Sequence, residues 1–305
     1  MNTTEASPML AVPSTGASGR DPLCYEDLIA TGQWIGDTKV DGIRAFLRWD
    51  GAEPTFTNRH GVDVTRRFPE LQAMKLGPEP LWLDGEIVAL DGRFETVLTR
   101  DKQGKGASIQ RLSVSHPCRF MAFDVPEYAT WTFMDRRTAL EELLDGRTGP
   151  RIALTVVSDA PNFLDLTREA GLEGVIAKRK NSTYHFGRRS KSWVKFKNLH
   201  RLTALVSGYT AGTGQRQRTF GALNLMLVDD QGQLVPIGTV GSGFSEREIH
   251  ELKARLDSGE VLAVEIECLN RTSGNVLRFP VYKGIRTDVH ILDCSTKQLD
   301  PIPSC

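Results

Sequence analysis

A lysine, an aspartate and an arginine lie close together in the stretch GDTKVDGIRA, residues 36–45. Lys39 is a candidate nucleophile, because Gly42 marks a turn beside which a phosphate can approach its amine. A tight hairpin with charged edges needs the same residue types and no chemistry. The tetrapeptide K-x-D-G fixes only three positions, so it does not decide between these two interpretations.

Two glutamates follow in apolar surroundings. Glu86 lies inside LWLDGEIVAL, and Glu173 precedes the buried-looking GVIA of GLEGVIAKR. A carboxylate among apolar neighbours needs a partner, because an unpaired buried charge is costly. Two such groups would suit Mg²⁺, held partly by carboxylates and partly by substrate phosphates. Taken separately, each glutamate is also compatible with a structural position at a turn or strand end.

Two lysines alternate with apolar residues in RRSKSWVKFKN. Residues two apart in a strand share a face, so Lys195 and Lys197 point the same way and repel one another unless an anion lies between them. The stretch 178–197 carries eight Lys or Arg residues and no acidic residue. This stretch is either a local binding surface for phosphates or a solvated basic loop.

Short strands and helices must position these groups. Apolar spacing predicts a helix over 25–33, followed by a meander of short strands in which Lys39 lies near a strand end. Buried strands are expected at 81–90 and 118–125, amphipathic helices at 134–146 and 162–172, and further strands at 173–180 and 192–198.

From about residue 203 the pattern changes to short strands around one helix at 245–259. Five or so strands with one helix inserted after the third predict a small closed barrel of the oligonucleotide-binding type. The expected organisation is therefore a disordered tail over 1–20, a first domain over 21–198, a linker over 199–203 and the barrel over 204–305.

Bulk composition limits the alternatives. The chain has 305 residues, 40% hydrophobic and 25% charged, which suits two modest domains. Lys plus Arg and Asp plus Glu both total 38, so any site for a polyanion must be local. Five scattered cysteines without a C-x-x-C pair indicate reduced thiols and no zinc site. Without a signal peptide or an apolar run of membrane length, we expect a cytoplasmic protein, associated with the nucleoid if bacterial.

The order of the motifs carries more information than any one of them. KVDGIR, TNRHG, LDGEIV, FMAFD, EGVIAK and SWVKFK occur in this order over residues 39–197, and RFPVYKGIRTD follows at 278–288. This series resembles the nucleotidyltransferase motifs of ATP-dependent DNA ligases, especially the minimal bacterial and viral members. The resemblance implies an α+β fold, in which an ATP-grasp-like adenylation domain with antiparallel sheets and helices precedes an OB-fold β-barrel.

The resemblance also implies a reaction. The family adenylates a lysine with ATP, passes AMP to the 5′-phosphate of a nick in double-stranded DNA, and joins the 3′-hydroxyl with release of AMP. Lys39 would take the AMP, and Asp41 would position the 3′-hydroxyl and a metal ion. Arg44 would reach ribose and substrate, and Arg59 would hold the 5′-phosphate. Crowding by other cations would favour the neutral amine that attack requires.

The other implied nucleotide contacts form three groups. Glu86 and Glu173 would bind metal or ribose, Phe123 and Ile176 would sandwich adenine, and Lys195 and Lys197 would clamp the α-phosphate. The expected cofactors are ATP, as the donor of AMP, and Mg²⁺, which Mn²⁺ could replace.

Two positions depart from the family pattern. Asp37 stands where the family often has a glutamate that faces the adenine amino group, and its reach is shorter. Arg286 and Asp288 match the last motif, which orients the leaving pyrophosphate, but Val289 follows where the family usually has lysine. Lys283 is a candidate to take over that contact.

DNA contacts are expected from basic residues of both domains. We expect a monomer that binds nicked duplex DNA, and the sequence does not identify any recruiting protein. Arg100, Lys102, Lys105 and Arg111 form either another phosphate contact or a mobile surface loop. The residues predicted to contact DNA are Arg59, Arg188, Arg189, Lys191, Arg216 and Arg218.

Alternative functions use parts of the same pattern. An RNA ligase or an mRNA-capping guanylyltransferase shares the lysine chemistry, although EGVIAK favours adenine and several RNA ligases carry other C-terminal domains. A NAD-dependent ligase would be much longer and carry a cysteine zinc site. A non-catalytic nucleic-acid-binding module would have lost catalytic residues, whereas Lys39, Glu86, Glu173, Lys195 and Lys197 are all present.

Overall fold

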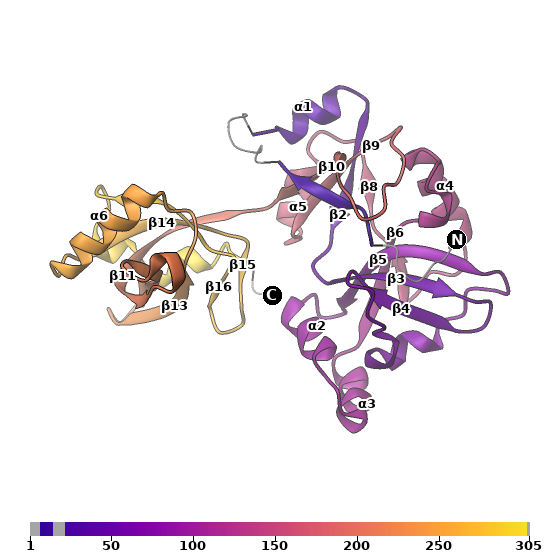
Figure 1. Ribbon diagram of the computed structural model, residues 1–305, viewed down its shortest axis with the longest axis horizontal. Helices are drawn as coiled ribbons and strands as arrows, with labels where there is room; N and C mark the ends of the chain where they lie inside the picture. Colours follow the sequence, from indigo (N-terminus) through magenta and orange to yellow (C-terminus); the bar gives the residue numbers. More distant parts are fainter. Residues whose placement is uncertain (1–6, 15–21, 304–305) are drawn as a thin grey trace. The chain divides into compact units, whose positions relative to one another are not determined.

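The computed structural model describes residues 7–14 and 22–303 (Figure 1). Contacts within the chain separate two units, Met1–Asn198 and Leu199–Cys305, here called the first and the second unit. Each is described by itself. Within the described ranges, no helix is both long and apolar enough to cross a lipid bilayer.

The first unit contains two five-stranded sheets, and the β2 sheet carries Lys39. Its strand order is β1 (Leu10–Pro13), β10 (Arg189–Lys197), β9 (Gly174–Arg179), β2 (Trp34–Lys39) and β8 (Val157–Ser158). β1 runs parallel to β10, and the other neighbours are antiparallel. Alternating residues such as Val175 and Phe196 give one apolar face, which packs against α1 (Tyr25–Ala30) and α5 (Phe163–Glu169).

The second sheet of this unit, the β5 sheet, carries Glu86. Its order is β4 (Pro54–Asn58), β3 (Ile43–Trp49), β5 (Leu81–Ala89), β6 (Cys118–Asp124) and β7 (Ile152–Leu154). Only the β6–β7 pair is parallel in this sheet. Fully buried residues including Leu47, Phe56, Leu83 and Phe120 form its core.

Helices and short helical turns cover this sheet. α4 packs against β6, and α2 packs against β5. Figure 1 shows α2 and α3 next to one another at one end of the unit. The bounds are α2 (Phe94–Asp101), α3 (Gly106–Ser115), α4 (Phe133–Leu143), η1 (Thr65–Arg67), η2 (Pro69–Ala73) and η3 (Pro126–Tyr128).

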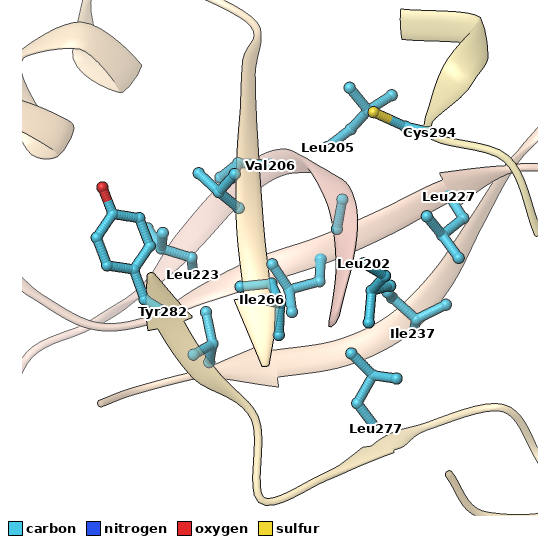
Figure 2. Close-up of a cluster of buried hydrophobic side chains, with 14 of the residues drawn as sticks. Leu202, Leu205, Val206, Leu223, Leu227, Ile237, Ile266, Leu277, Tyr282 and Cys294 are labelled. Carbon is cyan, nitrogen blue, oxygen red and sulfur yellow. The ribbon is translucent and has the colours of Figure 1, made fainter. Parts of the chain in front are cut away.

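The second unit is a five-stranded antiparallel sheet with one longer helix. The order is β13 (Leu234–Val240), β12 (Phe220–Val228), β11 (His200–Ala211), β14 (Leu262–Cys268) and β17 (Val281–Arg286). Side chains from all five strands meet in one core (Figure 2). The helix α6 (Glu246–Asp257) begins with a capping box between Ser245 and Glu248. The remaining elements are β15 (Asn270–Arg271), β16 (Leu277–Arg278), η4 (Gly214–Arg216), η5 (Ile291–Asp293) and η6 (Thr296–Leu299).

The sequence predicted a closed barrel for this unit. Among the described residues, strand pairing runs from β13 to β17 and no ladder joins these two outer strands. What the structure shows is therefore a single core formed by a curved set of antiparallel strands and α6. Closure of the barrel is not confirmed.

Two predicted boundaries and one predicted orientation were wrong. Residues 10–13 of the expected disordered tail form β1, and Met9 before them is fully buried. Residues 1–6 and 15–20 of the expected tail lie outside the described residues. Residues 200–203 of the expected linker belong to β11. Of the stretch with two alternatives, Lys102 and Lys105 lie on the exposed segment between α2 and α3, and Arg111 lies within α3. The sheets of the first unit are mixed because β1 and β7 pair in parallel.

Candidate active site

A cavity of about 290 Å³ lies in the first unit, lined by residues of both of its sheets. Lys39 lines it from the end of β2. The structure brings together predicted residues that are far apart in the sequence. Those that line the cavity are Asp37, Lys39, Arg44, Arg59, Glu86, Phe123, Ile176, Arg189 and Lys195.

One glutamate binds two lysines beside the cavity. Glu173 forms ion pairs with Lys39 and, at 3.0 Å, with Lys197. Burial opposes ionisation of Glu173, but the two ammonium groups outweigh it and hold its pKa below the ordinary value. The predicted role of Glu173 as a metal or ribose ligand stays a prediction, because in the structure its carboxylate is used by lysines.

Glycines allow this close arrangement. A Cβ on Gly174, next to Glu173, would lie 2.1 Å from the carbonyl oxygen of Phe196. A Cβ on Gly42 would lie 2.2 Å from the carbonyl oxygen of Ile87. Gly42 is therefore required for contact with β5, whereas the sequence suggested that it leaves room for a nucleotide.

Cations gather at the same end of the cavity. Partial burial lowers the pKa of Lys195, and the nearby charges of Lys197, Arg189 and Lys39 lower it further. Such a group of cations is stable when an anion neutralises it. We call this end, which Lys39 and Lys195 line and beside which Lys197 pairs with Glu173, the phosphate end.

Glu86 is the carboxylate that lines the cavity at this end. Burial raises its pKa to about 7, although the charges of Lys39 and Arg44 act in the opposite direction. Its oxygens are the hard donors that Mg²⁺ prefers, so the site fits such an ion in this respect. No cluster of three or more Asp, Glu, His or Cys side chains supports a metal among the described residues.

The opposite end is apolar with one buried ion pair, and we call it the base end. Phe123, Ile176 and Trp193 line it. Lys178 Nζ lies 2.6 Å from Asp37 Oδ2, and both side chains are 2% exposed. The second carboxylate oxygen, Oδ1 of Asp37, has no hydrogen-bond partner in the described structure. Asp37 lines the cavity, which leaves this acceptor for a ligand.

Lys178 was missed by the sequence reasoning. It donates to the carbonyl oxygen of Phe123 at 3.3 Å and lies 4.4 Å from the centre of the Trp193 ring. Its place two residues after Ile176 on β9 is the signal that could have found it, because such residues share a face.

Arg44 is fixed between the two ends. Its Nε and Nη2 each lie 2.6 Å from the carboxylate of fully buried Asp84. Its guanidinium carbon lies 4.5 Å from the centre of the Phe123 ring. Burial alone would lower the pKa of Arg44, but Asp84 outweighs burial and raises it. Asp84 precedes Glu86 by two residues, yet the sequence reasoning gave it no role.

Comparison with known proteins agrees with this geometry. The family model described as ATP dependent DNA ligase domain matches residues 8–197. The chain belongs to the ATP-dependent DNA ligase family. It is 32% identical over 295 residues to the multifunctional non-homologous end joining protein LigD of Pseudomonas aeruginosa, covering 84% of this chain and 34% of that one. It is 30% identical over 318 residues to a DNA ligase of Thermococcus fumicolans, covering 92% of this chain and 56% of that one. The chain thus spans a third to about half of these relatives.

Solved structures show the same similarity. A mycobacterial DNA ligase D complexed with ATP and MES is 27% identical, with a TM-score of 0.52, and the match covers 95% of this chain and 97% of that one. A Lig E DNA ligase, 24% identical with a TM-score of 0.65, matches in fold over 91% of this chain and 99% of that one. The ligase fold therefore extends over both units of this chain.

The basic residues of the first unit that are expected to bind DNA are all exposed. Arg59 is exposed at the cavity and donates to His60 Nε2 at 3.0 Å. Arg189 donates to the carbonyl oxygen of Ala11 and lines the cavity. Arg188 and Lys191 are exposed. Their roles at DNA stay predictions.

Further predicted contacts lie in the second unit of the ligase. Arg218 is exposed, and Arg216 donates to the carbonyl oxygen of Gly241 at 2.9 Å. Arg286 forms a two-point ion pair with Asp288, with distances of 2.8 and 2.9 Å. The predicted role of Arg286 in orienting pyrophosphate stays a prediction.

Several other predicted residues do not line the cavity, among them Asp41 and Arg100. Asp41 lies just after β2 and does not line it. Arg100 is buried and donates to Glu70 at 2.8 Å, which argues against the phosphate contact that was one of two alternatives for its stretch. The guanidinium of Arg100 already has a carboxylate partner, and a buried cation with that partner does not reach DNA.

Proposed function

We propose that this chain is an ATP-dependent DNA ligase that seals nicks with a 5′-phosphate and a 3′-hydroxyl. The observation that carries the proposal is one cavity with two chemically different ends. Lys39 and further cations lie at the phosphate end, and an unsatisfied carboxylate oxygen of Asp37 lies among apolar residues at the base end. An adenine nucleotide has the matching polarity.

At the base end, Phe123 and Ile176 would enclose the adenine ring. Asp37 Oδ1 would accept a hydrogen bond from the 6-amino group, which guanine lacks at that position. Lys178 donates to the other oxygen of Asp37 and holds the carboxylate in place. Asp37 reaches less far than a glutamate would, but its ion pair with Lys178 fixes the direction of its carboxylate.

At the phosphate end, the amine of Lys39 would attack the α-phosphorus, and the bond to pyrophosphate would break. The Lys39–Glu173 ion pair requires the ammonium form, whereas attack requires the neutral amine, so this pair must open first. Lys195 and Lys197 would bind the α-phosphate oxygens and stabilise the charge that develops there. Bound Mg²⁺ would supply further neutralisation of phosphate charge, with Glu86 as the residue that would hold it.

The AMP on Lys39 would then pass to the 5′-phosphate of the nick, with Arg59 holding that phosphate. Attack by the 3′-hydroxyl on the activated phosphate would form the phosphodiester and release AMP. The exposed Arg188, Lys191 and Arg218 would contact DNA phosphates. We also propose that the second unit is an OB-fold barrel, that the ligase is monomeric, and that nicked duplex DNA is its substrate.

The test is capture of AMP from ATP labelled at the α-phosphate, followed by sealing of a nicked duplex. We expect the wild-type chain to retain the label and seal the nick, and Lys39→Ala to do neither. Lys75→Ala is the matched control, because Lys75 is exposed and does not line the cavity. Label captured by Lys39→Ala would contradict the mechanism. Preference for GTP or for nicks in RNA would favour the capping or RNA-ligase alternatives.

A further inference from the structure

The first strand contributes directly to the cavity. Leu10 and Ala11, consecutive residues of β1, both line it. In a regular strand such neighbours point to opposite faces. Leu10 and Ala11 pair in register with Arg189 and Ser190, and the pairing with β10 shifts only after them, between Ala11 and Val12. Irregular pairing of this kind frequently occurs beside functional sites.

Ala11 lies at the base end. It packs against the cluster of buried residues that contains Phe123 and Trp193, and Ile176 packs against the same cluster. Val12, the next residue, packs against the separate cluster that contains Phe196. The strand therefore has one residue directed to the adenine site and its neighbour directed to the core.

Side chains of the site itself hold this segment in place. Met9 is fully buried, its N–H donates to Tyr184 Oη at 3.1 Å, and its carbonyl oxygen accepts from Arg44 Nη2 at 3.3 Å. Tyr184 in turn donates to Asp84 at 2.6 Å, the carboxylate that also binds Arg44. Arg189 donates to the carbonyl oxygen of Ala11. The segment is thus fixed at successive residues, as a wall of a binding site must be.

We propose that Leu10 and Ala11 are specificity-determining residues that form a wall of the adenine site. This inference rests on the proposed function, because it takes the cavity to hold ATP. The small side chain of Ala11 leaves space for a purine, and a larger side chain would occupy that space. The wall touches the base and not the reacting phosphate, so it sets the affinity for ATP and not the rate of attack by Lys39.

The experiment compares Ala11→Leu with Val12→Leu, which adds bulk to the same strand on its other face. The apparent KM for ATP and the rate at saturating ATP are measured in formation of the lysine adduct, with inorganic tripolyphosphate as a competitor that has no base. We expect Ala11→Leu to raise the KM about tenfold or more. The saturated rate and the inhibition by tripolyphosphate stay unchanged, and Val12→Leu keeps the wild-type KM.

Each outcome bears on the wall. An unchanged KM in Ala11→Leu overturns it, and so does weaker inhibition by tripolyphosphate, which would indicate general damage to the cavity. If Ala11→Leu shows no cooperative thermal unfolding, Leu10→Ala replaces it, and a wild-type KM in that variant overturns the wall. If the wild-type chain itself captures no AMP, the proposed function fails, and the wall fails with it.

Discussion

At the base end of the cavity, Asp37 and Lys178 form an ion pair in which both side chains are 2% exposed. At the phosphate end, Glu173 shares two lysines, and the Lys39 and Lys197 side chains are 22% and 29% exposed. The buried pair is costly to break, because each partner would be left as an uncompensated charge. The pairs at the phosphate end are partly exposed on their lysine side and cost less to rearrange. In the proposed function, the ion pair of the base end stays in place and a bound triphosphate rearranges those of the phosphate end.

The largest effect is expected when the cations of the phosphate end are removed. We expect the double variant Lys195→Ala, Lys197→Ala to form the lysine–AMP adduct at least a hundredfold more slowly, because the developing charge on the α-phosphate loses its donors. Single-turnover capture of labelled AMP at saturating ATP measures this, with Lys75→Ala as the control. A loss below tenfold would contradict the role of these two lysines.

At the base end the largest expected effect is on stability. Asp37→Asn leaves the Lys178 ammonium buried without a counterion, so we expect the free energy of unfolding to fall by about 3 to 5 kcal/mol. Denaturant unfolding measures it. The double variant Asp37→Asn, Lys178→Met removes both charges and should recover most of the loss. It should still bind ATP weakly, since the acceptor for the 6-amino group is changed. Wild-type stability in Asp37→Asn would contradict the account of the pair.

At the phosphate end, Glu86 should make the stability of the chain depend on pH. The pKa of Glu86 is raised to about 7 in the folded chain, whereas an unfolded glutamate has its ordinary value near 4.5. Between these values the folded state binds more protons, so this group makes the chain less stable as pH rises through that window. Glu86→Gln should reduce the fall in melting temperature between pH 5 and pH 8. Parallel pH dependence in wild type and variant would contradict the assigned pKa.

The smallest expected effect lies outside the cavity. Lys191 is exposed and its proposed partner is a DNA phosphate. Lys191→Ala should reduce the slope of log affinity for nicked DNA against log salt by about 1, with little change in AMP capture. Affinity measured across a salt series checks this. An unchanged slope would remove Lys191 from the DNA contacts.

The sequence predicted the strands of Lys39, Glu86 and Lys195 because alternation of apolar residues indicates which positions are buried. It did not find Asp84 or Lys178. Their importance depends on which strands are neighbours and in what register, which is a property of the sheets and not of any one segment.

The first strand was missed for a different reason. Leu10–Pro13 has four residues, ends in proline and follows a polar start, so its local pattern favours disorder. Its order comes from pairing with β10 and from buried Met9, both of which are distant contacts. The closed barrel was expected from the count and order of strands, which do not decide whether the outer strands pair.

The ion pair between Lys39 and Glu173 has a consequence for chemical selectivity. An amine held as a charged ammonium does not react with stray electrophiles, such as acyl phosphates or cyanate, that modify free lysines. In the proposed mechanism, the pair would protect Lys39 for as long as the carboxylate holds it. Lys39 would become reactive only when the phosphates of ATP displace Glu173, so the contact that blocks the amine would also restrict its reaction to ATP.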